Sequence, residues 1–415
     1  MRNYANNGGM FHVLANPTYR RLFTAKVVSL LGTGLATVAL SLLAYDLAGD
    51  NAGAVLGTAF AVKMIAYVMV APIAAALVEG HSRKSVLVGS EIVRVGAALS
   101  LPFVTEIWQI YLLIFLLQSA SATFTPTLNA LIPEVLPREK DYTAALSLAR
   151  LAGDLEAVAS PSIAALLLLV VSKRQLFDGT ACGFAASALL ILAVALPQQR
   201  ALDDGNTAPF RQRVRRGVQL FFANPTLRPI LAVNLVVAAV VSIVLVQSVV
   251  LVRGVLGLGE SALGLVLAVN GAGSMSAAFL LPRLLERYQD RQVMRGGVIT
   301  LLAASLTLVG VLATVSGHVL LGCILALWFV IGLGWAGAEV PVGRVIRRAV
   351  DDVDLPAAFA AQFSLSHACW LFTYPLVGYL GDRSLVVAAV VMSILAIIGT
   401  LSATKLWSSS ANGKQ

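Results

Sequence analysis

The sequence predicts an all-α membrane protein with 12 transmembrane helices, arranged as two six-helix parallel pseudo-repeats with both termini in the cytoplasm. Of its 415 residues, 58% are hydrophobic and 12% are charged, whereas about a quarter of the residues of a soluble domain are charged. The chain contains 12 apolar runs, each long enough to supply the roughly 20 residues that a spanning helix needs. A short segment also recurs at the start of each half. Together these features exclude a soluble fold.

The polar segments between the apolar runs are mostly short, so consecutive helices are expected to form antiparallel hairpins. The longest interruption is charged and separates six runs from six. We therefore predict an N-terminal bundle over 1–197, a cytoplasmic linker over 198–228 and a C-terminal bundle over 229–415. The runs expected to span the membrane lie at 22–48, 52–78, 85–104, 107–129, 144–171, 176–197, 229–252, 262–281, 294–316, 319–340, 356–380 and 384–406.

Lysine and arginine are distributed unequally between the two ends of the predicted helices. Of the 30 such residues, 22 lie on one side, four on the other and four inside helices. By the positive-inside rule, the richer side, with both termini and the linker, faces the cytoplasm. The net charge of +9 is then a topology signal, and nucleic acid is not an expected partner. We expect a multi-pass protein of the bacterial inner membrane in contact with the lipid bilayer.

The two halves repeat each other. The segment LANPTYR at 14–20 recurs as FANPTLR at 222–228, each time directly before the first helix of its half. This offset pairs Lys26 with Asn234, and a similar offset pairs Lys63 with Asn270. Because each unit has an even number of helices, both copies enter the membrane from the same side. Such parallel repeats are typical of secondary transporters whose two bundles rock about a central site.

The loop AALVEGHSRK at 75–84 resembles the G-x-x-x-D-R-x-x-R-R/K motif of the major facilitator superfamily, with three departures. Alanine, glutamate and glycine replace the first glycine, the aspartate and the first arginine of the motif. The resemblance covers essentially the whole chain and implies a charge latch that holds the two bundles together on the cytoplasmic side. The implied gating residues, to which we add Arg94 and Arg150, are Glu79, Arg83, Lys84, Glu286, Arg287 and Arg291.

Further segments narrow the resemblance. RRLF, FTPTLNALIP and ALSLARL are similar to the drug:proton antiporter branch that includes the macrolide exporters. LLGTGLATVALSLLAYDLAG, RLAGDLEAVASP and AAQFSLSHACWLFTYPLVGYLGD look like exporters associated with nickel resistance. The resemblance implies proton-coupled export of a small toxic solute such as nickel by alternating access. The alternatives are a multidrug or siderophore exporter, or a lipid flippase or sensor on the same fold.

The sequence contains neither a nucleotide-binding loop nor a motif of hydrolytic enzymes. We therefore expect a monomeric transporter that is not an enzyme, has no cofactor and works on a small-molecule or ion substrate together with protons.

Ionisable residues inside apolar runs are costly and therefore need a partner, water or a function. Lys63 lies 11 residues into its run, about 16 Å deep, and is expected to be either a substrate-binding cation or half of a permanent ion pair. Arg150 and Asp154 are spaced as a helical pair, which leaves Glu156 as the better candidate for reversible protonation, ahead of Asp154. For Glu91, spaced three residues from Arg94, a static pair is favoured over a proton relay.

The run at 356–380 has an aromatic stripe of Phe363, His367, Trp370 and Tyr374, which suits the wall of a substrate cavity. His367 is a candidate metal ligand or proton group, with a hydrogen-bonded packing role as the alternative. Cys369 lies about 200° around the helix from His367 and cannot easily join the same site.

Four uncharged polar residues complete the substrate-binding candidates, with ordinary interhelical hydrogen bonding as the alternative. The resemblance implies that the second run (52–78) meets the eleventh (356–380) and that the fifth (144–171) meets the eighth (262–281). Lys63 is then expected to face His367. The four residues are Thr33, Thr37, Asn234 and Asn270.

Overall fold

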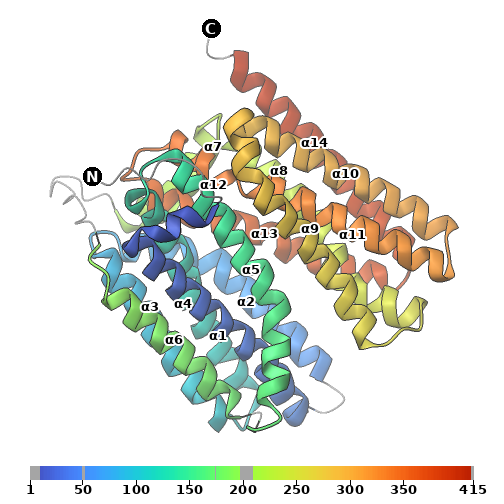
Figure 1. The fold of residues 1–415 in the computed structure, drawn as a ribbon, viewed down its shortest axis with the longest axis horizontal. Coiled ribbons are helices and arrows are strands. Elements are labelled where there is room, and N and C mark those ends of the chain that lie inside the picture. The colour runs from blue at the N-terminus through green and yellow to red at the C-terminus, as the bar shows by residue number, and fades with distance from the viewer. Residues whose placement is uncertain (1–9, 49–51, 173, 197–208, 413–415) are drawn as a thin grey trace.

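The structure, a computed structural model, describes residues 10–48, 52–172, 174–196 and 209–412. These residues form helices joined by short turns, and no strand occurs among them. Two lobes of helices lie side by side, one from each half of the chain (Figure 1). The expected boundary between residues 197 and 198 falls outside the described residues.

The bounds of the helices follow the apolar runs closely. The N-lobe contains α1 (Pro17–Ala48), α2 (Ala52–Leu77), α3 (Arg83–Ser100), α4 (Ile107–Val135), α5 (Glu139–Leu167) and α6 (Leu176–Leu192). The linker contributes α7 (Phe210–Ala223). The C-lobe contains α8 (Arg228–Ser242), α9 (Glu260–Arg287), α10 (Asp290–Thr314), α11 (Gly317–Glu339), α12 (Val342–Ala349), α13 (Leu355–Gly381) and α14 (Leu385–Asn412). A short 3₁₀ helix, η1 (Met10–Ala15), precedes α1.

Nine helices in the described part of the chain are long and apolar enough to cross a membrane. The other three expected spans correspond to α6, which is apolar but shorter, and to α5 and α13, which are long but carry more polar side chains. The chain is thus a helical multi-pass membrane protein, and the count of 12 spans and the cytoplasmic termini stay predictions. The polar residues of these two helices include Arg150, Asp154 and Glu156 on α5 and His367 on α13, which are candidate site residues.

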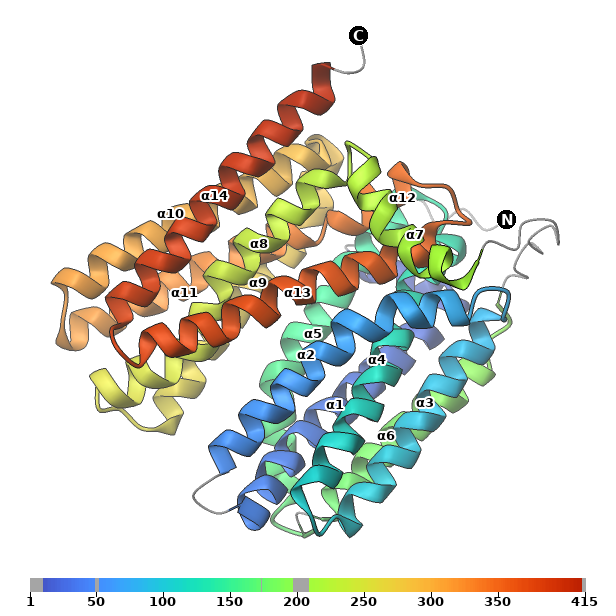
Figure 2. The ribbon, with the colours of Figure 1, turned by 180° about the vertical axis from the view of Figure 1, so that it is seen from behind.

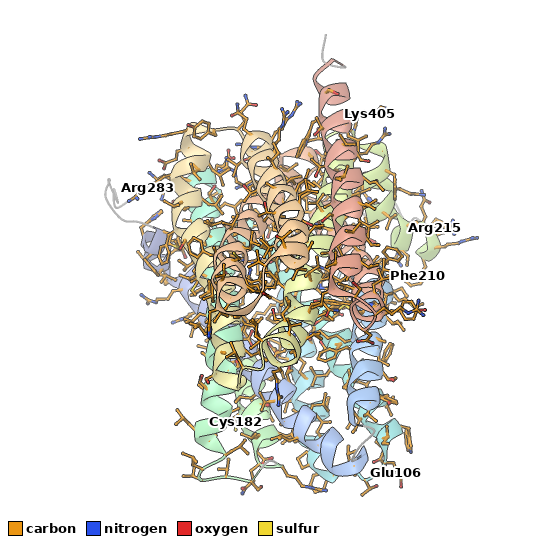
Figure 3. The ribbon with its side chains drawn as sticks, turned by 90° about the vertical axis from the view of Figure 1, so that its right-hand side faces the viewer. Glu106, Cys182, Phe210, Arg215, Arg283 and Lys405 are labelled. Atoms are coloured by element: carbon orange, nitrogen blue, oxygen red, sulfur yellow. The ribbon has the colours of Figure 1, made fainter. Side chains whose placement is uncertain are left out.

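Basic side chains gather at one end of the lobes. Figure 3 labels Arg215, Arg283 and Lys405 toward this end, whereas Glu106 lies at the opposite end. Because α7 and α12 also lie here (Figure 1), we name this end the linker side and the opposite end the far side. The distribution matches the charge bias that the sequence predicts.

The first helix of the C-lobe departs from the expected continuous α-helix over 229–252. After α8 the chain passes through two π-helical turns, η4 (Ile243–Gln247) and η5 (Val250–Val255). Gln247 at the end of η4 and Ser248 directly after it bond neighbouring helices: Gln247 Nε2 donates to Val377 O at 2.7 Å and Trp328 Nε1 donates to Ser248 Oγ at 2.8 Å. These tertiary bonds accompany the wider turns, which are rare inside helices.

Helices α9 and α11 cross in close contact within the C-lobe. A Cβ atom on Gly273 would collide with the carbonyl of Phe329, and one on Gly332 would collide with the carbonyl of Asn270. Small residues of this kind allow membrane helices to approach at the backbone. This crossing fixes the position of α11, whose end carries Glu339.

The lobes meet through α2 with α13 and through α5 with α9, so the expected pairing of helices is confirmed. Helix α4 also contacts α13. Figure 2 shows α2 and α13 side by side near α7 and farther apart toward the far side. The lobes therefore converge on the linker side and separate toward the far side.

Candidate functional site

A group of charged residues joins the lobes on the linker side. Arg344 Nη2 lies 2.8 Å from Glu139 Oε1, and its Nε lies 2.9 Å from Asp290 Oδ1. Arg348 Nη1 lies 2.7 Å from Asp290 Oδ2, and Arg348 also pairs with Glu139. We name Glu139, Asp290, Arg344 and Arg348 the latch. Its two positive and two negative charges are balanced, and Glu139 is the member that belongs to the N-lobe.

Glu286, at the end of α9, and Glu79, in the loop after α2, occupy equivalent positions of the repeat, and both make ion pairs on the linker side. Glu286 Oε1 lies 2.9 Å from Nζ of Lys140 in the other lobe. Glu79 pairs with two arginines of α7: its Oε2 lies 3.6 Å from Arg213 Nη1 and its Oε1 lies 3.9 Å from Arg216 Nη1. Arg216 Nε in turn lies 2.5 Å from Asp354 Oδ1, just before α13. Helix α7 thus connects the two lobes through Arg216.

Three other predicted gating residues bond inside the N-lobe. Arg83 Nη1 lies 2.5 Å from Glu134 Oε1, and Lys84 Nζ donates to the carbonyls of Leu192 and Val194 at 2.6 and 2.8 Å. Arg94 pairs with Glu91 of the same lobe. Arg287 is exposed and Arg291 half-buried at the linker side. The gate indicated by these contacts therefore centres on Glu79, Glu286 and the latch.

Latch residues Arg344, Arg348 and Glu139 were not among the sequence-based candidates. The two arginines counted only as topology signals, although their spacing of four residues puts them on one face of a helix. Asp290 lies between the predicted gating residues Arg287 and Arg291, which was its available signal. The ion pairs that cross between the lobes join residues about 200 positions apart, as with Arg348 and Glu139, and no local pattern predicts them.

A second charged group lies deeper between the lobes and is centred on Arg150 of α5. Its Nε lies 3.1 Å from Asp154 Oδ1 and donates to Ser274 Oγ of α9 at 2.7 Å. Its Nη1 lies 3.1 Å from Oε2 of Glu339 at the end of α11. The guanidinium carbon stands 3.9 Å from the centre of the Trp335 ring. The expected Arg150–Asp154 pair is confirmed, and the inter-lobe partner Glu339 is a residue that sequence reasoning missed.

Lys63 of α2 faces α13, as expected, and an aromatic side chain lies between them. Its Nζ lies 5.7 Å from the centre of the Tyr67 ring, which is 4.7 Å from the ring of His367 and 4.8 Å from that of Phe363. Tyr67 donates its hydroxyl to Gln118 Oε1 at 2.7 Å. Among the described residues Lys63 makes no direct ion pair, but it interacts electrostatically with His367 and Glu156.

The predicted aromatic stripe of α13 divides between two surroundings. Phe363 and His367 contact α2 of the N-lobe through Tyr67. Trp370 instead lies 6.1 Å from Trp335 of α11 and 5.1 Å from Tyr374, within the C-lobe. Trp335 connects this second half to Arg150. The stripe therefore supplies two aromatic surfaces, one near Lys63 and one near Arg150.

His367 has one ring nitrogen already engaged. The Nδ1 atom lies 2.6 Å from the carbonyl oxygen of Phe363, and a carbonyl can only accept, so Nδ1 carries the proton. The Nε2 atom then offers a lone pair when the ring is neutral. No group of three or more histidine, cysteine or carboxylate side chains placed to hold a metal occurs among the described residues.

The remaining predicted residues bond inside one lobe. Asn234 and Gln362 form a pair of amide hydrogen bonds at 3.2 and 3.0 Å, and Asn270 Nδ2 donates to Trp328 O at 2.8 Å. Thr33 and Thr37 donate to carbonyls of their own helix. These contacts fit ordinary hydrogen bonding within or between helices more closely than binding of a substrate.

Glu91 and Arg94 form a buried group in the N-lobe. Arg94 Nη1 lies 3.4 Å from Glu91 and donates to Ser29 Oγ at 2.7 Å, while its Nη2 donates to Ser121 Oγ at 2.6 Å. Ser187 donates to Glu91 at 2.8 Å. Every one of these partners belongs to the N-lobe, so the contacts favour a static pair over a relay or a gate.

The fold and the inter-lobe contacts define the class of the protein, a two-lobed helical membrane transporter. A family model described as Major Facilitator Superfamily matches residues 22–361. The chain therefore belongs to the major facilitator superfamily, whose members are transporters rather than enzymes.

Relatives and solved structures agree with this membership. The chain is 27% identical over 286 residues to the uncharacterized MFS-type transporter YfiS of Bacillus subtilis (strain 168), covering 68% of this chain and 65% of that one. It is 22% identical over 218 residues to Macrolide efflux protein A of Streptococcus pyogenes, covering 51% and 53%. It thus spans less than two thirds of the length of either relative. A bacterial homologue of the iron transporter ferroportin, solved in an outward-facing state, superposes with a TM-score of 0.79 at 13% identity over 94% of this chain and 99% of that one, which shows the shared fold.

Proposed function

We propose that this chain exports a small lipophilic solute from the cytoplasm of a bacterium in exchange for protons, and that its linker side faces the cytoplasm. The observation that best supports the proposal is the latch between Arg344 and Glu139, which closes the linker side while α2 and α13 separate toward the far side. A transporter that alternates between its two openings needs such a breakable contact on each side.

The inter-lobe surfaces favour a solute with an apolar body and a basic group. Trp335 and Tyr374 offer partly exposed aromatic area beside the buried ring of Trp370. Asp154 and Glu339 both pair with Arg150, whose guanidinium lies over the Trp335 ring. Aromatic rings bind apolar ligand surface, and a few carboxylates fix an amine. A macrolide combines a large apolar ring with an amino sugar, and one relative is a macrolide efflux protein. We therefore assign macrolide-like compounds as the substrate class.

Nickel is the second candidate. The observation that favours it is His367, whose Nδ1 is fixed by the Phe363 carbonyl so that Nε2 is available as a ligand. Water or groups carried by the substrate must then complete the coordination shell. The nearby positive charge of Lys63 repels a bare cation, which makes nickel the weaker of the two proposals.

We also propose that the chain acts as a monomer, with bundles over 1–197 and 229–415 joined by a linker over 198–228. Each lobe has its own apolar core, around Val237 and Trp328 in the C-lobe and around Tyr19 and Tyr142 in the N-lobe. Tyr67, beside Lys63, meets His367, and Arg150 meets Glu339, where the two lobes of one chain face each other, so a single copy supplies the whole pathway.

A growth assay tests the substrate class. The chain is expressed in a bacterial host that lacks its own drug exporters, and tolerance to erythromycin, nickel and siderophore overload is compared with that of the empty vector. We expect higher tolerance to erythromycin alone. Higher tolerance to nickel alone would support the second candidate, and no change for any compound would contradict export of a toxic solute.

A further inference from the structure

Arg150 holds two carboxylates, one from each lobe. Asp154 lies one helical turn away on α5, with 3.1 Å between Oδ1 and the arginine Nε. Glu339 approaches from the C-lobe, with 3.1 Å between its Oε2 and the arginine Nη1. The side chains of Arg150 and Asp154 are 13% and 11% exposed and that of Glu339 is 31% exposed. Glu339 is thus the carboxylate that water reaches most easily.

The charges of this group do not balance. Two carboxylates surround one guanidinium, and the neighbouring side chains Ser274 and Trp335 are uncharged. Arg150 and Asp154 are the charged groups that face Glu339 from the helices packed against it. An excess negative charge between membrane helices is unfavourable. One proton, or one cationic group of a ligand, neutralises the group.

The two ion pairs respond differently to movement of the lobes. The Arg150–Asp154 pair lies within one helix and persists when the lobes move as bodies. The Arg150–Glu339 pair and the hydrogen bond to Ser274 cross between α5 and the C-lobe. Separation of the lobes on the linker side therefore breaks the contact with Glu339 and leaves that with Asp154.

From this geometry we infer that Glu339 is the coupling carboxylate of the transporter and that it holds Arg150, a proton or a cationic substrate in turn. The inference rests on the proposed exchange of solute for protons. A proton from far-side water adds to Glu339 Oε2 and displaces Arg150, which stays paired with Asp154. Loss of the inter-lobe pair lets the lobes part on the linker side, where the proton leaves to the cytoplasm and the substrate takes its place.

Glu156 provides a matched comparison on the same helix. It accepts a hydrogen bond from Ser160 at 3.1 Å and packs against Gly34 of α1. All of these groups belong to the N-lobe, so protonation of Glu156 breaks no contact between the lobes. If Glu156 carries the proton, as the sequence predicts, Glu156→Gln should lose the response to pH. If Glu339 carries it, Glu339→Gln should lose the response instead.

The test measures the distance between the lobes without any substrate. Spin labels are placed at Thr105→Cys and Ser316→Cys, exposed positions on the far side of the N-lobe and C-lobe, in a background without the three native cysteines. Distance distributions are recorded by double electron–electron resonance from pH 9 to pH 5. For one proton the ratio of the two states changes by at most about tenfold per pH unit.

A short distance between the far-side labels reports an open linker side. In the parent protein we expect the population with this short distance to increase as the pH falls. Glu339→Gln should show the acid distribution at every pH, Glu339→Asp should restore a response, and Glu156→Gln should respond like the parent. A parent distribution that does not change with pH, or a Glu339→Gln response equal to that of the parent, would overturn the inference. Because the readout needs no substrate, failure to export erythromycin would contradict the proposed function alone.

Discussion

Arg344 of α12 and Glu139 of α5 join the two lobes, with 2.8 Å between Nη2 and Oε1. The arginine side chain is 8% exposed, whereas that of Glu139 is 43% exposed. The carboxylate therefore comes from the wet edge of the interface and the guanidinium from its interior. Such an arrangement forms and breaks with little rearrangement on the side of the carboxylate, which suits a contact that opens in every transport cycle.

Loss of the latch carboxylate should open the linker side. Glu139→Gln removes the N-lobe partner that Arg344 and Arg348 share and leaves their C-lobe partner Asp290. We expect the closed state to lose about 1 kcal/mol, the upper value for an exposed pair, or about fivefold in population. The measurement is the distance between spin labels at His81→Cys and Tyr288→Cys on the linker side. Arg287→Gln, which removes an exposed charge from the same side, is the control. An equal shift in both variants would show that the overall charge of the linker side, and not the latch, controls closure of that side.

Lys63→Ala should impair transport more than Lys26→Ala. Lys63 lies between the lobes beside Tyr67 and acts on His367 and Glu156. Lys26 lies at a small cavity inside the N-lobe that is lined by Tyr19, Leu22 and other residues of the same lobe. We expect at least a tenfold loss of transport rate for Lys63→Ala and less than threefold for Lys26→Ala, about 1.4 and 0.6 kcal/mol in barrier height. Equal and mild effects would show that a positive charge between the lobes is unnecessary.

The crossing of α9 and α11 predicts a pair of opposite stability effects. In Gly332→Ala the new methyl group collides with the carbonyl of Asn270, and overpacking of this kind costs about 1–3 kcal/mol. Gly310→Ala has no atom within 4 Å of the added Cβ and removes a flexible residue from a helix, so it should be neutral or stabilise by about 0.5–1 kcal/mol. Thermal unfolding in detergent compares the two. A melting temperature for Gly332→Ala as high as that for Gly310→Ala would rule out the tight crossing.

Single substitutions in α13 separate the two candidate substrates. If macrolides are bound on the aromatic surface near Arg150, Trp370→Ala should lower the affinity for erythromycin by more than tenfold, because it removes the ring packed against Trp335 and Tyr374. His367→Ala should then have a smaller effect. Binding to purified protein is measured by calorimetry with erythromycin and with nickel, and Cys369→Ala is the control. Nickel binding that disappears in His367→Ala alone would instead favour the metal.

The helices were predictable because spanning segments need long apolar runs, and the runs end where charged residues begin. The π-helical turns were not predictable, since residues 243–255 are mostly apolar and fit an α-helix equally well. Contacts with distant residues, such as Gln247 with Val377, accompany the change of hydrogen-bond register. No local sequence pattern around residues 243–255 indicates those contacts.

The candidate site was predictable where it depends on spacing along one helix. The Arg150–Asp154 pair follows from a separation of four residues, and the structure has it. Glu339 stands at the end of an apolar run and looks like an ordinary helix terminus until α5 is placed beside α11. The aromatic stripe of α13 was recognised as one face, but its two halves contact different lobes: His367 lies against Tyr67 of α2, whereas Trp370 lies near Trp335 of α11.

Transport across a sealed membrane tests the central proposal most directly. Purified protein is reconstituted into proteoliposomes, and movement of labelled erythromycin is followed with and without an imposed pH gradient, with Arg344→Ala as a variant that lacks one of the two latch arginines. We predict movement opposite to the proton gradient, at least tenfold faster with the gradient than without it and lost in the variant, because exchange requires both coupling and alternation between the two openings. Movement at the same rate with and without the gradient would contradict a proton-coupled exporter.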